Sequence, residues 1–335
     1  MPSPEPRHAP PGAVATGPCG TASPIVDPAS VLVVVPVYNG GRVWREAAPA
    51  LARAQKASCH RIRVKVVDSS SRDDSARVAR ESGFDVVTID TADFDHGGTR
   101  NAAVRGAADD FLVFLTQDAI LHGARAIDEL LAAFSDAQVA VAYGRQLPHS
   151  DANPIAAHAR TFNYPAAPYV AGLEDKQRLG IKTVFASNSF AAYRADVFHA
   201  LGGFPEHNIV SEDMYLTARA VMAGHKVAYV PTACARHSHN YGPLEELRRY
   251  FDIGVFQQDE AWIGRTFGAA EGEGMRFVRS EFRYLLGRAP LWVPRACLHN
   301  ALKIVGYRLG RHYPVLPSML RRHLTMHRAH WAQRR

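Results

Sequence analysis

The sequence has few cysteines, and none of them is spaced as a metal-binding or paired cysteine would be. Its 335 residues contain four, Cys19, Cys59, Cys234 and Cys297, with no CxxC pair among them. We interpret them as reduced thiols, some of them buried as small hydrophobic side chains. This cysteine usage leads us to expect a cytoplasmic protein.

Long apolar runs and two common N-terminal motifs are also missing. No apolar run approaches the length of a transmembrane helix. Residues 1–29 are rich in proline and alanine and lack the apolar core of a secretory signal, so we expect a disordered leader there. The first apolar strand is followed by Pro-Val-Tyr-Asn-Gly-Gly (36–41) instead of GxGxxG, which disfavours the usual dinucleotide-binding fold.

Positive charge is concentrated in one segment. The whole chain has a net charge of +7, but residues 276–335 contain thirteen Lys or Arg residues and a single acidic residue, Glu281. This segment therefore carries a charge of about +12, and the remainder about −5. A basic tail on a mildly acidic body indicates an anionic partner, which could be a membrane surface, a nucleic acid or a phosphorylated ligand.

Apolar strands alternate with helical segments between residues 30 and 242. The β-branched run Val31–Val35 is typical of a parallel strand buried on both faces. Further strands are predicted at 64–67, 85–89, 111–115, 139–143 and 226–230, and helices at 44–56, 73–81, 99–107, 124–134, 194–201 and 212–223. This alternation predicts an α/β fold with a doubly wound, mostly parallel sheet.

Two regions depart from the alternation. Residues 147–180 are irregular, which in an α/β enzyme is typical of a functional insertion. From residue 243 onward the sequence is helical and basic. We therefore predict a leader at 1–29, a catalytic domain at 30–242 and a helical basic extension at 243–335.

Polar residues follow several of the predicted strands. Asp118 comes just after the run Phe111–Leu115, and Asp68 ends the second strand. Open α/β folds bind ligands at the carboxyl ends of their strands, and a carboxylate there can bind a divalent cation that carries a diphosphate. The alternative is that these residues only begin a turn or cap the next helix.

Two loops could contact a nucleotide. Tyr38 can stack on a base and Asn39 can hydrogen-bond a sugar or base, while Asp68 can accept a hydrogen bond from N3–H of a pyrimidine. Arg100, at the start of a helix after Asp-His-Gly-Gly-Thr (95–99), can reach a phosphate. Ordinary turns and a capping loop explain the same residues equally well on local grounds.

A second acidic pair and a later histidine pair complete the candidate groups. Glu212 and Asp213 open a helix, where they either complement the helix dipole or supply a general base for a sugar hydroxyl. His237 and His239 point the same way if that segment is extended. These are the groups needed to hold a metal–diphosphate and to deprotonate a hydroxyl.

Read together, these segments resemble family 2 glycosyltransferases of the GT-A fold, and more narrowly bacterial rhamnosyltransferases. The resemblance rests on Pro-Val-Tyr-Asn (36–39), Val-Asp-Ser (67–69), Phe-Asp-His-Gly-Gly-Thr-Arg-Asn (94–101), Leu-Thr-Gln-Asp-Ala (115–119), Tyr-Gly-Arg-Gln-Leu-Pro (143–148), Ser-Asn-Ser (187–189), Gly-Gly-Phe (202–204), Glu-Asp-Met (212–214) and His-Ser-His-Asn-Tyr (237–241). It implies an inverting transfer of L-rhamnose from dTDP-β-L-rhamnose to a glycan or lipid-linked acceptor hydroxyl in the synthesis of a cell-surface polysaccharide such as O-antigen.

The resemblance also assigns roles residue by residue. Asp213 matches the catalytic base, with Glu212 beside it, and Asp118 and His237 match the ligands of a Mg²⁺ or Mn²⁺ ion. The residues implied at the donor are Pro36, Tyr38, Asn39, Asp68, Arg100 and Gln117, and those implied on the acceptor side are Arg145, Asn188 and His239. The chain has Thr-Gln-Asp where the family has an Asp-x-Asp type motif, so Gln117 replaces one carboxylate and is expected to contact ribose.

Four other interpretations concern these residues or the basic tail. The donor could be another nucleotide-sugar, such as a UDP-sugar, because the fold does not fix the donor. The basic tail could bind nucleic acid, but the chain lacks the motifs of such proteins and we expect no nucleic-acid partner. The tail could instead hold the enzyme at the inner face of the cytoplasmic membrane. A non-catalytic nucleotide-binding scaffold is disfavoured by the presence of Asp118, Asp213 and His237.

Overall fold

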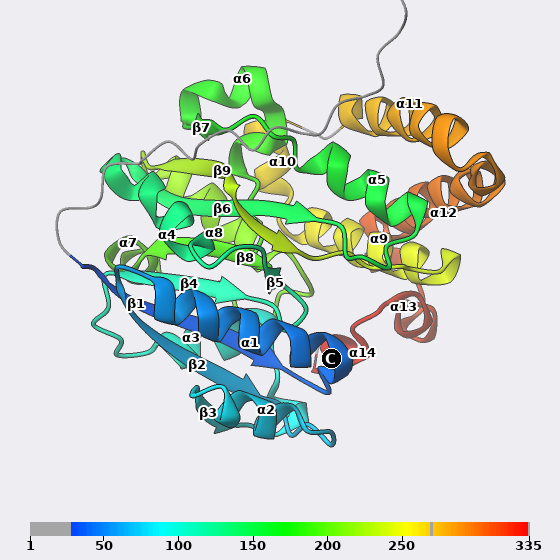
Figure 1. Ribbon diagram of the computed structural model, residues 1–335. Coiled ribbons are helices and arrows are strands. Elements are labelled where there is room, and N and C mark those ends of the chain that lie inside the picture. Colours follow the sequence, from blue (N-terminus) through cyan, green and yellow to red (C-terminus); the bar gives the residue numbers. More distant parts are fainter. Residues whose placement is uncertain (1–27, 269–270, 334–335) are drawn as a thin grey trace, which may run out of the picture.

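A nine-stranded sheet runs through the computed structural model, which describes residues 28–268 and 271–333. The predicted leader lies outside the described residues except for its last two positions. The strand order is β3-β2-β1-β4-β8-β6-β9-β5, with β7 paired to β9 (Figure 1). The strands are β1 (Ser30–Val37), β2 (Arg61–Asp68), β3 (Asp85–Thr88), β4 (Phe111–Leu115), β5 (Ile120–Leu121), β6 (Val139–Leu147), β7 (Tyr169–Ala171), β8 (Phe190–Arg194) and β9 (Lys226–Arg236).

Helices cover the sheet and continue beyond its last strand (Figure 1). They are α1 (Gly41–Ala57), α2 (Ser75–Glu81), α3 (His96–Val104), α4 (Ala126–Leu131), α5 (Pro154–Asn163), α6 (Lys176–Leu179), α7 (Ala195–Ala200), α8 (Glu212–Met222), α9 (Pro243–Asp259), α10 (Ala261–Phe267), α11 (Glu271–Arg288), α12 (Val293–Arg311), α13 (Ser318–Leu324) and α14 (Arg328–Gln333). None of the helices in the described part of the chain is long and apolar enough to cross a membrane.

The α/β class is confirmed, and the sheet is mixed. Strands β3, β2, β1 and β4 are parallel to one another, but β8 lies antiparallel between β4 and β6. The direction changes because the chain leaves β6 at the carboxyl edge of the sheet and also enters β8 from that edge. Between them the connection reaches the opposite end of the sheet, where Ala171 of β7 pairs with Val227 at the start of β9.

The central strand β1 is buried on both faces, as its continuous β-branched sequence predicts. Val31, Val33 and Val35 belong to the hydrophobic core that α1 covers through Trp44. Leu32 and Val34 belong to the core on the opposite face.

The C-terminal helices share this opposite core. Phe251 and Val255 of α9 belong to it together with Tyr313 and Trp331. The predicted extension begins where α9 begins, at Pro243. The division of the chain at residue 242 stays a prediction, since both parts pack into one continuous core.

The region 147–180 contains more regular structure than its sequence led us to expect. Helix α5 spans Pro154–Asn163, with Pro154 in its first turn and the Asn153 side chain accepting a hydrogen bond from Ala156 N–H at 2.9 Å. The Asn-Pro pair is a helix-start signal that could have been recognised in the sequence. Helix α5 also carries Arg160, whose side chain donates a hydrogen bond to Gln146.

Candidate active site

The predicted site residues gather at the carboxyl edge of the sheet. Pro36 on β1 lies in parallel register with Val67, and Asp68 is the last residue of the neighbouring strand β2. Asp118 follows β4, which pairs with β1 on its other side. Parallel pairing thus brings together two acidic residues that are far apart in the sequence.

The loop after β1 is held by side chains from the neighbouring loops. The Gln117 side chain accepts from Tyr38 N–H at 2.7 Å and donates to the Tyr38 carbonyl at 3.2 Å. Asn39 has a left-handed φ of 46°, and its side chain accepts from Arg72 N–H at 2.8 Å. Gln117 therefore fixes this loop and leaves Tyr38 with 45% of its surface exposed.

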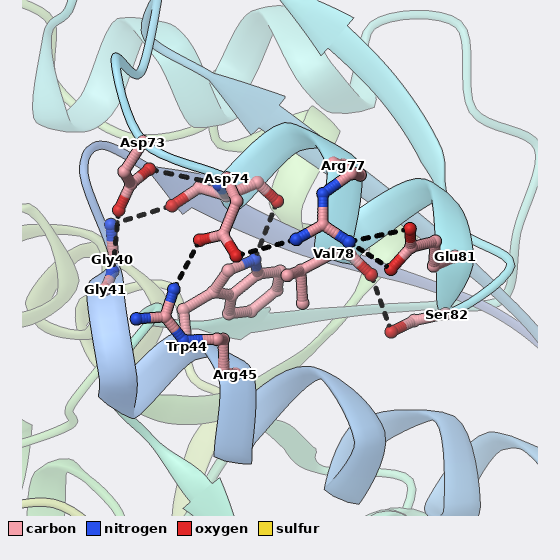
Figure 2. A network of polar contacts seen from close by, with 11 residues as sticks. Gly40, Gly41, Trp44, Arg45, Asp73, Asp74, Arg77, Val78, Glu81 and Ser82 are labelled. Atoms are coloured by element: carbon pink, nitrogen blue, oxygen red, sulfur yellow. Dashed lines mark hydrogen bonds and ion pairs between the residues drawn. The ribbon is translucent and has the colours of Figure 1, made fainter.

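Figure 2 shows how the start of α1 is tied to α2. Asp73 accepts from the backbone N–H groups of Gly41 and Ser75, and Asp74 pairs with Arg45 at 2.6 Å. The indole of Trp44 donates to the Ser75 carbonyl at 3.0 Å. These contacts fix the two loops that flank Asp68.

One carboxylate oxygen of Asp68 has no hydrogen-bond partner within the protein. Asp68 is buried, and its Oδ2 accepts from Ser71 N–H at 3.2 Å. Its Oδ1 is buried without any partner in the described structure. An unpaired buried acceptor is costly, so this atom fits a donor group supplied by a ligand.

Asp118 forms a cluster with two histidines of the segment after β9. The distances from Asp118 Oδ2 are 3.4 Å to His237 Nε2 and 3.7 Å to His239 Nδ1. Burial alone would raise the pKa of Asp118, but both imidazoles favour its charged form and hold that pKa well below its usual range. His239, predicted on the acceptor side, thus lies with the predicted metal ligands.

This cluster fits a divalent cation. It offers one carboxylate oxygen and two imidazole nitrogens, all within 4.8 Å of one another. His237 Nδ1 lies 2.9 Å from Gln146 Oε1, which orients the ring and leaves Nε2 facing Asp118. Oxygen and imidazole ligands of this kind suit Mn²⁺ and accommodate Mg²⁺.

Two arginines that were not identified from the sequence lie beside the cluster. Arg160 on α5 donates to Gln146 Oε1 at 2.5 Å, and its Nε is buried without a partner. The guanidinium of Arg249 on α9 lies 5.7 Å from the centre of the Tyr241 ring, and that ring stacks on His239. Within the described ranges, neither arginine forms an ion pair with a carboxylate, so this corner has positive charge available for an anion.

The two acidic residues at the start of α8 have different surroundings. Glu212 is buried, accepts from Asn188 Nδ2 at 3.0 Å and pairs with the buried Arg100 at 3.1 Å. Arg100 also donates to the His96 carbonyl at 2.7 Å. The guanidinium of Arg100, predicted to reach the donor phosphate, is therefore engaged with Glu212 in this structure.

Asp213 is partly exposed, and its pKa is higher than that of an ordinary aspartate. Its Oδ2 accepts from Asn188 N–H at 2.9 Å. Burial, followed by the negative charge of Glu212, raises the pKa of Asp213 to about 7. A carboxylate with this pKa can accept a proton at neutral pH, as a general base must.

The turn 187–189 contacts both Asp213 and His237, which belongs to the cluster with Asp118. Asn188 binds both acids of the pair, and the next residue, Ser189, lies with its hydroxyl 3.5 Å from His237 Nε2. Arg145 on β6 donates to the Tyr164 carbonyl at 3.0 Å and so supports the insertion that contains α5. Asp213 and His237 are therefore contacted by two adjacent residues of the Ser-Asn-Ser segment.

Comparisons with known proteins show the family to which the chain belongs. The model of the family described as glycosyltransferase like family 2 matches residues 28–260. The chain is 49% identical over 304 residues to the O-antigen chain rhamnosyltransferase WbaN of Salmonella anatum, covering 90% of this chain and 96% of that protein. It is 48% identical over 303 residues to the O-antigen chain rhamnosyltransferase RfbN of Salmonella typhimurium, with the same coverage.

A solved structure shares the fold. The mannosyltransferase PcManGT from Pyrobaculum calidifontis, determined in complex with GDP-Man and Mn²⁺, superposes with a TM-score of 0.60 at 17% identity, covering 88% of this chain and 91% of that chain. At this level of identity, the likeness shows the GT-A type of fold alone.

Proposed function

Because the chain belongs to glycosyltransferase family 2, we propose that it is an inverting rhamnosyltransferase acting in O-antigen synthesis. The donor is dTDP-β-L-rhamnose, and the acceptor is a hydroxyl of a glycan or lipid-linked glycan. The observation that carries the proposal is the turn 187–189, which contacts Asp213 on one side and His237 on the other. These contacts support a base and a metal–diphosphate site that lie next to each other.

The proton of the acceptor hydroxyl passes to Asp213. The acceptor oxygen forms a bond to the anomeric carbon from the face opposite the nucleotide, while the bond from that carbon to the diphosphate oxygen breaks. One displacement inverts the anomeric centre and needs a single carboxylate on the acceptor side, unlike the paired carboxylates of a glycosidase. Asn188 holds Asp213 in place, and burial together with the charge of Glu212 raises the pKa of Asp213 to about 7.

The leaving diphosphate requires positive charge. Asp118, His237 and His239 would hold the divalent cation, which when bound supplies Lewis-acid charge to the diphosphate. Arg160 and Arg249 add charge that carboxylates of the protein do not neutralise, which supports a role in holding the anion. This addition matters because the motif Thr-Gln-Asp provides one carboxylate ligand fewer than an Asp-x-Asp type motif.

The nucleobase is read by the loops around β1 and β2. The unpaired Oδ1 of Asp68 supports acceptance of a hydrogen bond from N3–H of thymine. Uracil presents the same N3–H group, so a UDP-sugar remains the second candidate donor.

The basic helices support a peripheral position at the membrane. Leu286 at the end of α11 and Leu291 before α12 are exposed, and Arg283, Arg288 and Arg295 are near them in sequence. Apolar and cationic side chains together favour an interface with anionic lipid, where a lipid-linked acceptor would also lie. We infer that the enzyme works at the cytoplasmic face of the membrane.

The test is the release of dTDP, UDP or GDP from the corresponding nucleotide-sugars by purified wild-type protein and its Asp213→Asn variant. We expect a preference for dTDP-rhamnose, and a wild-type rate that rises with pH through about 7 as Asp213 loses its proton. The variant should lose about 10²–10⁴ in rate because a positioned base contributes that much, while binding dTDP nearly as well. Near-wild-type turnover by Asp213→Asn would overturn the assignment of the base, and a clear preference for a UDP- or GDP-sugar would overturn the donor.

A further inference from the structure

The end of the described chain returns to the catalytic edge of the sheet. Helices α13 and α14 lie on the side toward which the arrowheads of β1 and β4 point (Figure 1). The turn between these helices is anchored on α9, because Asp252 accepts from the Thr325 hydroxyl at 2.6 Å and from Met326 N–H at 2.9 Å. Thr325 and Asp252 are both almost completely buried.

This turn and the following helix are firmly docked. His327 N–H donates to the Thr325 hydroxyl oxygen at 2.9 Å, which closes the turn. Trp331 of α14 is buried, with its ring 5.3 Å from the ring of Tyr313 and 6.3 Å from that of Phe251. The segment 325–331 is therefore an ordered part of the same core as the catalytic domain.

The anchored turn places the imidazole of His327 against His96 at the start of helix α3. His327 Nδ1 lies 3.5 Å from His96 Nε2, and the two rings meet edge to face with centroids 4.9 Å apart. His96 is the first residue of α3, and its carbonyl accepts a hydrogen bond from Arg100. Arg100 in turn pairs with Glu212, the neighbour of Asp213.

We propose that His327 is a positioning residue of the transfer reaction: by packing on His96, it fixes the start of α3 and so holds the Arg100–Glu212 pair beside the base Asp213. The proposal rests on the proposed function, because it takes Asp213 as the base. It extends the active site to a turn more than 80 residues beyond the last strand, which ends at Arg236.

The electrostatics of the charged groups around this contact fit the proposal. His96 faces Asp95 and Arg100 of its own helix and Glu212 of α8, whereas His327 faces His96, His330 and Glu212. Burial lowers the pKa of both histidines, and that of His327 falls to about 4, so the two rings are neutral at pH 7. Two neutral rings add no positive charge beside Glu212, and burial together with the charge of Glu212 raises the pKa of Asp213.

The loss of His327 should therefore change both the rate and its pH dependence. Opening the contact admits water beside Glu212, which screens its charge and lets the pKa of Asp213 fall. For His327→Ala we expect kcat to drop about 10- to 100-fold, the size known for small displacements of a catalytic group. The acid limb of the kcat profile should move to lower pH, while the KM for dTDP-rhamnose changes little.

Three variants separate packing from the polar contact. His327→Phe keeps a ring packed against His96, so we expect it to retain most of the rate and the wild-type pH profile. His327→Gln keeps a polar group but loses the ring, so we expect it to behave like His327→Ala. His323→Ala is the matched control, because His323 is an exposed histidine on α13 in the same tail.

The assay is the release of dTDP from dTDP-rhamnose between pH 5 and 9, with calorimetric binding of dTDP as the check on folding. Wild-type kcat and pH profile in both His327→Gln and His327→Ala would overturn the proposal, as would an equal loss in His323→Ala. The Asp213→Asn variant distinguishes the two failures. If Asp213→Asn is inactive and the His327 variants are normal, only this inference fails, whereas an active Asp213→Asn overturns the proposed base itself.

Discussion

Asp118 lies with two histidines, and Gln117 stands where a second carboxylate would complete an Asp-x-Asp type motif. One Asp with His237 and His239 gives a less negative site than such a motif, so we expect a dication to bind to the protein alone less strongly. The diphosphate of the donor would then provide much of the attraction. We therefore expect donor and metal to bind together, each increasing the affinity for the other.

The first prediction concerns this single-carboxylate site. Asp118→Asn and His237→Ala should each weaken Mn²⁺-dependent binding of dTDP at least about tenfold, since even the loss of outer-shell partners of a metal costs that much. Calorimetry of dTDP binding with Mn²⁺ and with EDTA measures the effect. His122→Ala, which alters an exposed histidine next to β5, is the control and should bind as the wild type does. Equal dTDP affinity and activity in EDTA would show that Arg160 and Arg249 serve the diphosphate without a metal.

At the scale of elements, the packing of α9 on α12 sets the position of the C-terminal helices. The two helices approach through glycines, because a Cβ at Gly310 would lie 2.1 Å from the Phe251 carbonyl oxygen and one at Gly306 would lie 2.2 Å from that of Leu247. No side chain fits at either position without moving a backbone. The close approach matters for function, since α9 carries Arg249 and the anchor Asp252.

Gly310→Ala should therefore destabilise the protein by about 1–3 kcal/mol, the usual cost of overpacking a core. Gly287→Ala is the matched control, because Gly287 is also helical but has open space around its Cβ position. There alanine should be neutral or stabilising by about 0.5–1 kcal/mol. Unfolding midpoints in urea measure both. Equal midpoints for the two variants would contradict the close packing of α9 and α12.

At the scale of the whole molecule, the basic extension divides its apolar residues between two surfaces. Leu285 and Trp331 are buried against the rest of the protein, whereas Leu286 and Leu291 are exposed, Leu291 by 92%. Packing on the domain and binding to lipid therefore involve different residues of this tail. The exposed set is the one available to a membrane.

The corresponding prediction is salt-sensitive binding to anionic vesicles. Each Lys or Arg near such a surface contributes about 1 kcal/mol, so a few are enough for measurable co-sedimentation. Leu286→Ser combined with Leu291→Ser should reduce pelleting with phosphatidylglycerol vesicles while leaving dTDP release from dTDP-rhamnose in solution unchanged. A parallel measurement with neutral vesicles separates the contribution of lipid charge from that of apolar insertion. If no protein pelleted with anionic vesicles at low salt, or if the double variant pelleted as much as the wild type, the exposed leucines would not form a membrane-binding surface.

Local sequence patterns were sufficient to predict the α/β sheet and the edge at which Asp68 and Asp118 lie. Continuous apolar runs such as Val31–Val35 predict buried parallel strands, and parallel pairing alone brings Asp68 and Asp118 to one edge. The position of a residue at a strand end is a local property, so pattern and period are sufficient to predict it. The antiparallel β8 could not be predicted in this way, because strand direction depends on which edge a connection returns to.

Which side chains contact each other became clear only from the folded chain. That Arg100 pairs with Glu212, that Gln117 binds the Tyr38 backbone and that His327 packs on His96 depends on contacts between residues as many as 231 positions apart. Such contacts follow from how helices pack, and no local period in the sequence encodes them. The raised pKa of Asp213 has the same origin, since burial and a neighbouring charge exist only once the chain has folded.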